Sequence, residues 1–105
     1  MIRWMIVLLM PFFFAVASCG RAEYATGEQA YRGECAKCHK LVGNGGTKGP
    51  DLTDIFQKKD AFYIREYTKD PRSFKPDGTM PPSKLTDREI DLVLEYMKEQ
   101  GRSRK

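Results

Sequence analysis

The sequence has few of the side chains that usually bind metal ions. Among its 105 residues there are three cysteines and a single histidine, His39. A structural zinc site takes four nitrogen or sulfur ligands and a catalytic zinc site takes three. Only Cys35, Cys38 and His39 lie close together in the sequence, and Cys38 and His39 are adjacent, which strains a tetrahedral site. Zinc is therefore a poor explanation of this cluster.

Other absences argue against further classes of protein. The glycine-rich stretch 42–52 is not followed by the Gly-Lys-Ser/Thr sequence of a phosphate-binding loop. The net charge is +4, but the basic residues form no run interleaved with aromatics, as a nucleic-acid surface requires. We therefore expect no nucleic-acid partner. No segment alternates as a strand does and no internal repeat is present, so we expect an all-α fold.

A long apolar run occurs at the N-terminus. Arg3 precedes a stretch from Trp4 to Ala17 that is typical of a secretory signal peptide and is shorter than the ~20 apolar residues of a membrane span. We assign residues 1–18 to this signal. The following Cys19, after Val-Ala-Ser, resembles the lipidated cysteine of bacterial lipoproteins, which becomes the mature N-terminus. The alternative is an ordinary small-residue cleavage site with an unmodified thiol.

Acylation of Cys19 would place the protein outside the cytoplasm, on the periplasmic or outer surface of a bacterial membrane. Two or more acyl chains form a firm anchor, because each buried CH₂ contributes ~0.8 kcal/mol. Residues 19–26 are then the lipidated cysteine and a short leader, 27–101 the folded domain and 102–105 a tail. Seven extended leader residues reach only ~25 Å. We therefore expect membrane-bound partners.

The capping patterns predict three or four helices and long loops. Thr26 with Gln29, and Thr86 with Glu89, are the N-cap and third-residue pairs of capping boxes. Gly101 predicts the end of the last helix. The expected helices begin at Thr26, extend over 60–69 and run from Thr86 to Gly101, whereas the stretches 42–52 and 72–84 are expected to be loops without regular elements.

These elements offer little apolar surface for a core. The last helix has a buried stripe at Ile90, Val93, Leu94 and Met97, with i, i+3, i+4 and i+7 spacing. Some eighty residues with so many loops bury too little apolar surface to be stable without a cross-link, metal or cofactor. The sequence therefore predicts that something bound near Cys35 completes the core.

The pentapeptide Cys-Ala-Lys-Cys-His, residues 35–39, matches the attachment pattern of c-type haem. The thiols of Cys35 and Cys38 lie on one turn and can add to the two vinyl groups of a porphyrin, while His39 binds the iron. A thioredoxin-like dithiol expects a βαβ context that the sequence lacks. A structural disulfide would leave His39 without a role. One covalent haem c is therefore the predicted cofactor.

The sixth iron ligand follows by elimination. His39 is the only histidine, and Met1, Met5 and Met10 belong to the signal peptide. Met97 lies on the apolar stripe, where methionine commonly fills the core. Met80 lies in a loop stiffened by two following prolines, which can hold a thioether toward a metal. We therefore predict His39 and Met80 as the metal ligands, together with Cys35 and Cys38 as the cofactor-binding residues.

With these residues, the chain without its signal peptide resembles the class I c-type cytochromes of bacteria over nearly its whole length. In that resemblance Lys-Gly-Pro-Asp-Leu carries the proline, here Pro50, whose carbonyl orients the proximal histidine. Asp-Gly-Thr-Met-Pro-Pro carries the distal methionine. The aromatic of the C-terminal helix, here Tyr96, meets the glycine and aromatic of the first helix, here Gly27 and Tyr31, which four-residue spacing already places on one helical face. The resemblance implies a small cytochrome c fold wrapped around one covalently attached haem.

This interpretation predicts a one-electron carrier, not an enzyme, that connects membrane-bound redox proteins as a monomer or as a subunit of a larger redox complex. Two alternatives stay open. In a haem-based sensor, Met80 would leave the iron to a small ligand. A peroxidase-like activity would need a distal base, and no second histidine is present.

Overall fold

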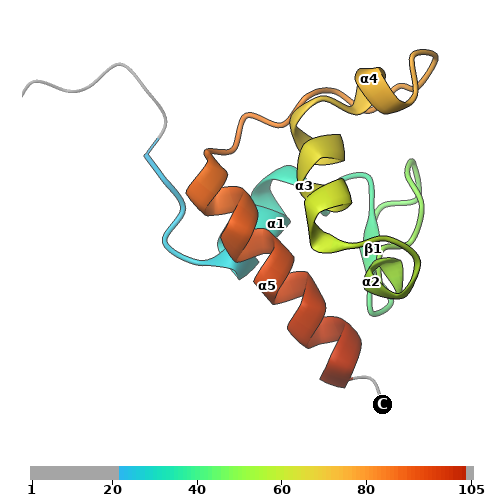
Figure 1. The fold of residues 1–105 in the computed structure, drawn as a ribbon. Helices are drawn as coiled ribbons and strands as arrows, with labels where there is room; N and C mark the ends of the chain where they lie inside the picture. The colour runs from blue at the N-terminus through green and yellow to red at the C-terminus, as the bar shows by residue number, and fades with distance from the viewer. Residues whose placement is uncertain (1–21, 104–105) are drawn as a thin grey trace, which may run out of the picture.

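The computed structural model describes residues 22–103, and Figure 1 shows α1 and α3 packed against the long helix α5, with α4 beside α3. The expected signal peptide and Cys19 lie outside the described residues. Within residues 22–103 there are five helices and one small hairpin, which confirms the predicted mostly helical fold with long loops. The elements are α1 (Gly27–Glu34), β1 (Lys40–Leu41), β2 (Asn44–Gly45), α2 (Ile55–Lys58), α3 (Ala61–Lys69), α4 (Pro71–Phe74) and α5 (Asp87–Ser103).

The three predicted helix starts are confirmed. At α1, the Gln29 N–H donates to Thr26 Oγ1 at 3.2 Å. At α3, the N-cap is Asp60, whose side chain accepts from the backbone of the third helical residue. At α5, the capping box is complete: Glu89 N donates to Thr86 Oγ1 at 3.2 Å, and Thr86 N donates to Glu89 Oε1 at 3.0 Å. Side chains thus satisfy backbone N–H groups that a helix leaves free at its start.

The predicted end of the last helix at Gly101 is wrong. Helix α5 continues through this glycine to Ser103, so the first two residues of the expected tail are helical. Gly101 has a packing role instead, because a Cβ at this position would lie only 2.8 Å from the carbonyl oxygen of Thr53. The missing side chain lets the loop before α2 approach the helix closely.

Three short elements were not predicted. Helix α2 has four residues, and so does α4, which begins at Pro71 and extends into the stretch 72–84 that was expected to have no regular structure. A proline is well tolerated in the first turn of a helix, where no N–H is needed. The hairpin pairs Lys40 with Gly45 and Leu41 with Asn44, and strands of two residues cannot show alternation in the sequence.

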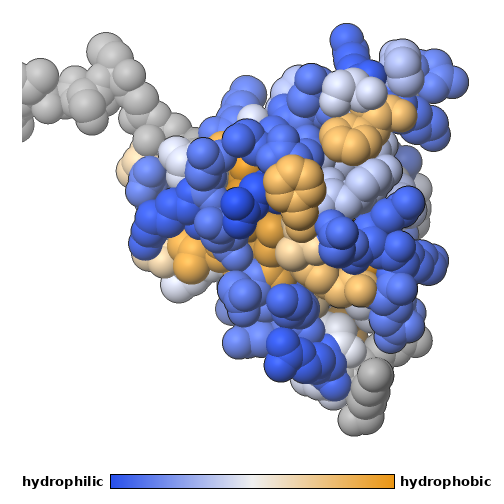
Figure 2. All heavy atoms as spheres, in the orientation of Figure 1, coloured by the Kyte–Doolittle hydropathy of each residue, from blue (hydrophilic) through white to orange (hydrophobic). Residues whose placement is uncertain are grey.

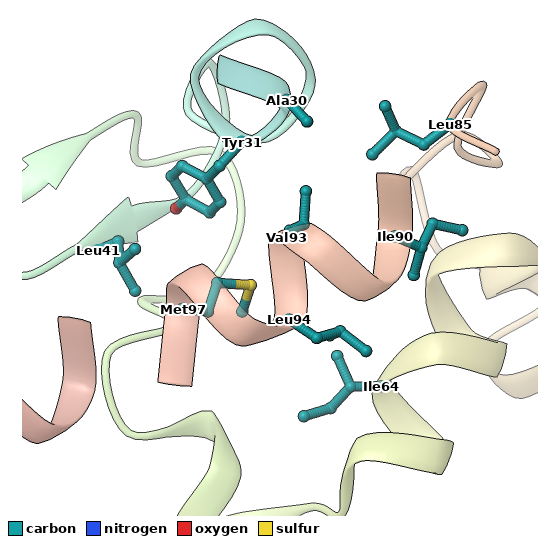
Figure 3. Close-up of a cluster of buried hydrophobic side chains, with 9 residues drawn as sticks. All are labelled: Ala30, Tyr31, Leu41, Ile64, Leu85, Ile90, Val93, Leu94 and Met97. Carbon is teal, nitrogen blue, oxygen red and sulfur yellow. The ribbon is translucent and has the colours of Figure 1, made fainter. Parts of the chain in front are cut away.

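The core lies where α5 packs between α1 and α3. The predicted stripe of α5 is confirmed: Ile90, Val93, Leu94 and Met97 are buried. Figure 3 shows the side chain of Leu94 directed toward Ile64 of α3, while other core residues approach α5 from α1, from β1 and from the segment before α5. The remaining members of the buried cluster are Ala30, Tyr31, Leu41 and Leu85.

Hydrophilic side chains cover much of the face shown in Figure 2, with apolar residues gathered in smaller areas between them. Among the described residues, the exposed large hydrophobic side chains are Phe62 and Phe74. Phe74 packs edge-on against Tyr63, with ring centroids 5.0 Å apart, so only part of this ring faces solvent. Of the helices between residues 22 and 103, none has the length and apolar character that crossing a bilayer requires.

Candidate functional site

The motif Cys35–His39 forms a tight turn at the end of α1. Cys35 is the C-cap of the helix and its N–H donates to the carbonyl of Tyr31 at 2.8 Å. The N–H groups of Cys38 and His39 both donate back to the carbonyl of Cys35, at 3.2 and 3.1 Å. Both cysteines are free thiols and half-buried. The structure therefore brings the two thiols and the imidazole together on one turn.

The Cys35 thiol lies in an environment that disfavours its charged form. Burial, followed by the neighbouring charges of Glu34 and Cys38, raises the pKa of Cys35 to about 11. This thiol is therefore protonated at neutral pH.

The loop that follows the hairpin wraps around the motif. Gly46 N donates to the carbonyl of Ala36 at 2.8 Å, and Gly49 N donates to the carbonyl of Cys38 at 2.7 Å. Thr53 anchors the far end of this loop, because its buried hydroxyl accepts a hydrogen bond from Val42 N at 2.8 Å. The backbone of the motif is thus held by Gly46 and Gly49, which lie ten and eleven residues after their partners in the sequence.

The imidazole of His39 is held by one nitrogen and leaves the other available. His39 is buried, and its Nδ1 lies 2.8 Å from the carbonyl oxygen of Pro50. Because a carbonyl can only accept, Nδ1 carries the proton and Nε2 has a free lone pair. The structure thus contains the contact that the resemblance implied for Pro50. Tyr31 holds the backbone of the same residue, since its hydroxyl donates to the His39 carbonyl at 3.3 Å. Burial raises the pKa of this hydroxyl, so it keeps the proton that it donates.

Gly49 shapes the position of the ring and was missed by sequence reasoning. A Cβ at residue 49 would lie 2.7 Å from Nδ1 and 3.0 Å from Nε2 of His39. The imidazole therefore packs against the bare backbone of this glycine. The neighbouring Pro50 could have pointed to it, because the two residues belong to the same short segment.

We expect Gly49→Ala to destabilise the protein by about 2 kcal/mol, because the added methyl group overpacks the site and displaces the His39 ring. The free energy of unfolding, measured with guanidinium chloride on the haem-containing protein, checks this. Thr47→Ala is the control, because it shortens an exposed side chain in the same loop and is expected to change stability by no more than about 0.5 kcal/mol. Equal losses in the two variants would contradict packing of Gly49 against the imidazole.

Met80 lies in the irregular segment between α4 and α5. Two backbone hydrogen bonds frame it: Gly78 N donates to Lys75 O at 2.9 Å, and Ser83 N donates to Thr68 O at 3.0 Å. Met80 is half-buried within this frame. Its role as an iron ligand stays a prediction.

Met97, the other methionine among residues 22–103, lies in the core. Only 3% of its surface is exposed, and Figure 3 shows it among the buried residues of α5. Its place in the hydrophobic cluster agrees with the core-filling role expected from the apolar stripe.

The residues present fit a covalently attached haem. Cys35 and Cys38 supply two free thiols on one turn, and His39 supplies a buried nitrogen whose ring is already oriented through Nδ1. An imidazole with its second nitrogen bound to a carbonyl is the usual arrangement of a metal-ligating histidine.

The comparison with protein families agrees with this geometry. The sequence model of the family described as Cytochrome c matches residues 24–101. Members of this family bind c-type haem covalently through a C-x-x-C-H motif, and Cys35 and Cys38 have that spacing. No curated protein and no solved structure matches the chain. Because the match spans most of the chain, this protein belongs to the cytochrome c family, whose members are haem-based electron carriers.

Proposed function

We propose that the protein carries single electrons between membrane-bound redox proteins, with an iron bound by His39 and Met80. The observation that carries this proposal is the hydrogen bond of 2.8 Å between His39 Nδ1 and Pro50 O, which leaves Nε2 for the metal. When bound, the haem supplies one reversible electron through its Fe(III)/Fe(II) couple.

The residues of the chain have three tasks in this proposal. Pro50 and Gly49 keep the imidazole of His39 in one orientation in both redox states, which limits the reorganisation that each electron transfer requires. The burial of His39 excludes water from the proximal side. The thioether of Met80 raises the reduction potential relative to a nitrogen ligand, because a soft sulfur favours Fe(II).

The proposal places the carrier on a membrane outside the cytoplasm. The family's domains are generally exported, and the sequence of the first nineteen residues supports a lipid anchor at Cys19. An anchored carrier with a short leader meets partners that are themselves membrane-bound, either as a separate monomer or as a subunit of a larger redox complex.

A matched pair of methionine variants tests the axial ligand. We expect Met80→Leu to lose the weak far-red absorption band of sulfur bound to ferric haem and, once reduced, to bind carbon monoxide. Met97→Leu makes the same chemical change in the core, and we expect it to keep the band and to refuse carbon monoxide. Absorption spectra of both redox states, recorded with and without carbon monoxide, provide the measurement.

Two results would overturn the His39–Met80 assignment. One is a far-red band that survives in Met80→Leu. The other is ready binding of carbon monoxide by the unaltered reduced protein, which would show an open coordination position and favour the sensor interpretation.

The midpoint potential of Met80→Leu is expected to fall by on the order of 0.1 V or more, within the ~0.8 V that axial ligands span in haem proteins.

A further inference from the structure

The segment that precedes α1 is attached to the first turn of α5. The N–H of Tyr24 donates to Glu89 Oε2 at 2.9 Å, and Arg88 pairs with Glu23 at 3.5 Å. These contacts join residues 65 apart in the sequence. Figure 1 shows this segment, drawn in blue, running beside the start of α5, drawn in orange.

Glu89 is the central residue of this attachment. It is fully buried, and its two carboxylate oxygens have separate tasks: Oε1 accepts from Thr86 N in the capping box, and Oε2 accepts from Tyr24 N. A capping box needs only the first of these bonds. The second bond attaches a distant segment to the helix. It also offsets the hydration that the carboxylate loses when it is buried.

The side chain of Tyr24 fixes the same segment to α1. Its hydroxyl donates to Glu34 Oε1 at 3.1 Å, and its ring lies over Gly33, where a Cβ would be 2.9 Å from the ring carbon Cζ. The segment is therefore attached to both helices, at the end of α1 and at the start of α5. We call Glu23, Tyr24, Arg88 and Glu89 the clamp.

We propose that the clamp makes the start of α5 the end of the domain that lies at the lipid surface. This inference rests on the proposed acylation of Cys19. From Cys19 to Glu23 the chain advances four residues, which reach at most ~14 Å when fully extended, compared with ~25 Å for a leader free over its seven residues. The clamp thus shortens the effective tether and fixes the point of the domain from which it leaves.

Two lysines lie at this end of the domain. Lys69 pairs with Asp87 at 3.0 Å at the start of α5, and the exposed Lys84 lies three residues before it. The other end of α5 lies ~25 Å away, since the helix has 17 residues of ~1.5 Å rise. Lysines at the two ends of α5 can therefore report which end faces the bilayer.

The experiment uses the acylated, haem-containing protein in vesicles of phosphatidylethanolamine and phosphatidylglycerol. Lysines are acetylated briefly, and the extent at each site is measured by mass spectrometry. The reference is the same domain after trypsin has cut at Arg21 and released it from the vesicles. We expect Lys84 to be modified several times less on vesicles than after release, whereas Lys58 in α2 and Lys98 near the end of α5 are modified equally. Equal modification of Lys84, or protection of Lys58 and Lys98 instead, would overturn the proposed orientation.

The clamp itself is tested by the rate of tryptic cleavage after Arg21, because a protease must extend several residues on both sides of the bond it cuts. In Glu89→Gln the amide keeps one acceptor oxygen, so one of the two hydrogen bonds is lost and cleavage is expected to accelerate about fivefold, as for one hydrogen bond. Glu95→Gln, on the exposed face of the same helix, is the control and is expected to behave as the unaltered protein.

A second variant, Arg88→Gln, removes the pair with Glu23 from the surface and keeps the test valid if Glu89→Gln fails to fold. Unchanged cleavage in both clamp variants would overturn the clamp. The intact mass of the vesicle-bound protein tests the acylation of Cys19 separately from the clamp. A mass without acyl chains would overturn the anchor at Cys19 and the membrane-facing role, whereas the cleavage rates in solution would still decide the clamp.

Discussion

A variant in which Cys35 and Cys38 are both replaced by serine is expected to lose its covalent haem and most of its helical structure. The buried hydrophobic core of the described part contains only nine residues, on α1, β1, α3, α5 and the loop before α5. Domains of this size rarely obtain more than a few kcal/mol from such a core and depend on an added cross-link, metal or cofactor. Without the thioether bonds, the haem can dissociate and the helices lose the group around which they pack.

The measurement combines a haem assay after acid precipitation, which retains only covalent haem, with circular dichroism in the far ultraviolet. Lys37→Ala is the control, because it changes an exposed residue between the two cysteines and keeps both thiols. We expect it to retain covalent haem and helix content. A double-serine variant that stays helical and unfolds cooperatively would contradict the view that the apolar core depends on the cofactor.

Local chemistry made much of this fold predictable. The hydroxyl of Thr26 and the pair Thr86–Glu89 satisfy helix N–H groups within three residues, so their effect is visible in a short stretch of sequence. The buried stripe of α5 depends on helical period alone. The C-x-x-C-H motif is local as well, since one turn brings its three functional side chains together.

The features that escaped prediction depend on contacts between distant segments. Glycine commonly ends a helix, but Gly101 lies within α5 and lets the backbone of Thr53 come close to it. No local sequence pattern reveals that contact. Gly49 faces the His39 ring only because a loop folds back over the motif. Glu89 was predicted as part of a capping box, and its second bond to Tyr24 N required the structure.

The turn of the hairpin could not be predicted for a different reason. Val42 has φ 48° and Gly43 has φ 80°, so the two central residues have the positive angles of a tight hairpin turn. A β-branched residue is unfavourable in that region, and sequence rules would look for asparagine or glycine there. Val42 packs against the core cluster and its N–H binds Thr53, which offsets the strained backbone.

Gly27→Ala is expected to lower the free energy of unfolding by about 3 kcal/mol, at the upper end for overpacking. Gly27 is buried where α1 crosses α5, and a Cβ there would lie 2.6 Å from the backbone carbonyl carbon of Leu92 and 3.0 Å from Cβ of Tyr96. Backbone atoms inside a helix cannot move aside as a flexible side chain can. The two helices must therefore separate, which exposes the apolar surface between them.

Thermal unfolding of the haem-containing protein checks this, with an expected fall in Tm of about 15 °C for a domain of this size. Gln29→Ala, at an exposed position two residues further along α1, is the control and is expected to change stability by no more than about 0.5 kcal/mol. A Gly27→Ala variant as stable as this control would show that the crossing has room for a methyl group.

The same substitution is expected to disturb the haem site, because the crossing and the site share Tyr31. Its ring packs against Tyr96 with centroids 5.7 Å apart, and its hydroxyl donates to the carbonyl of His39. Displacement of α1 moves Tyr31 and, at the C-cap of the same helix, Cys35. We therefore expect the midpoint potential of Gly27→Ala to differ from that of the unaltered protein, whereas Gln29→Ala keeps it. A variant that loses stability at an unchanged potential would show that the proximal side is held by Pro50 and the loop alone, independently of the position of α1.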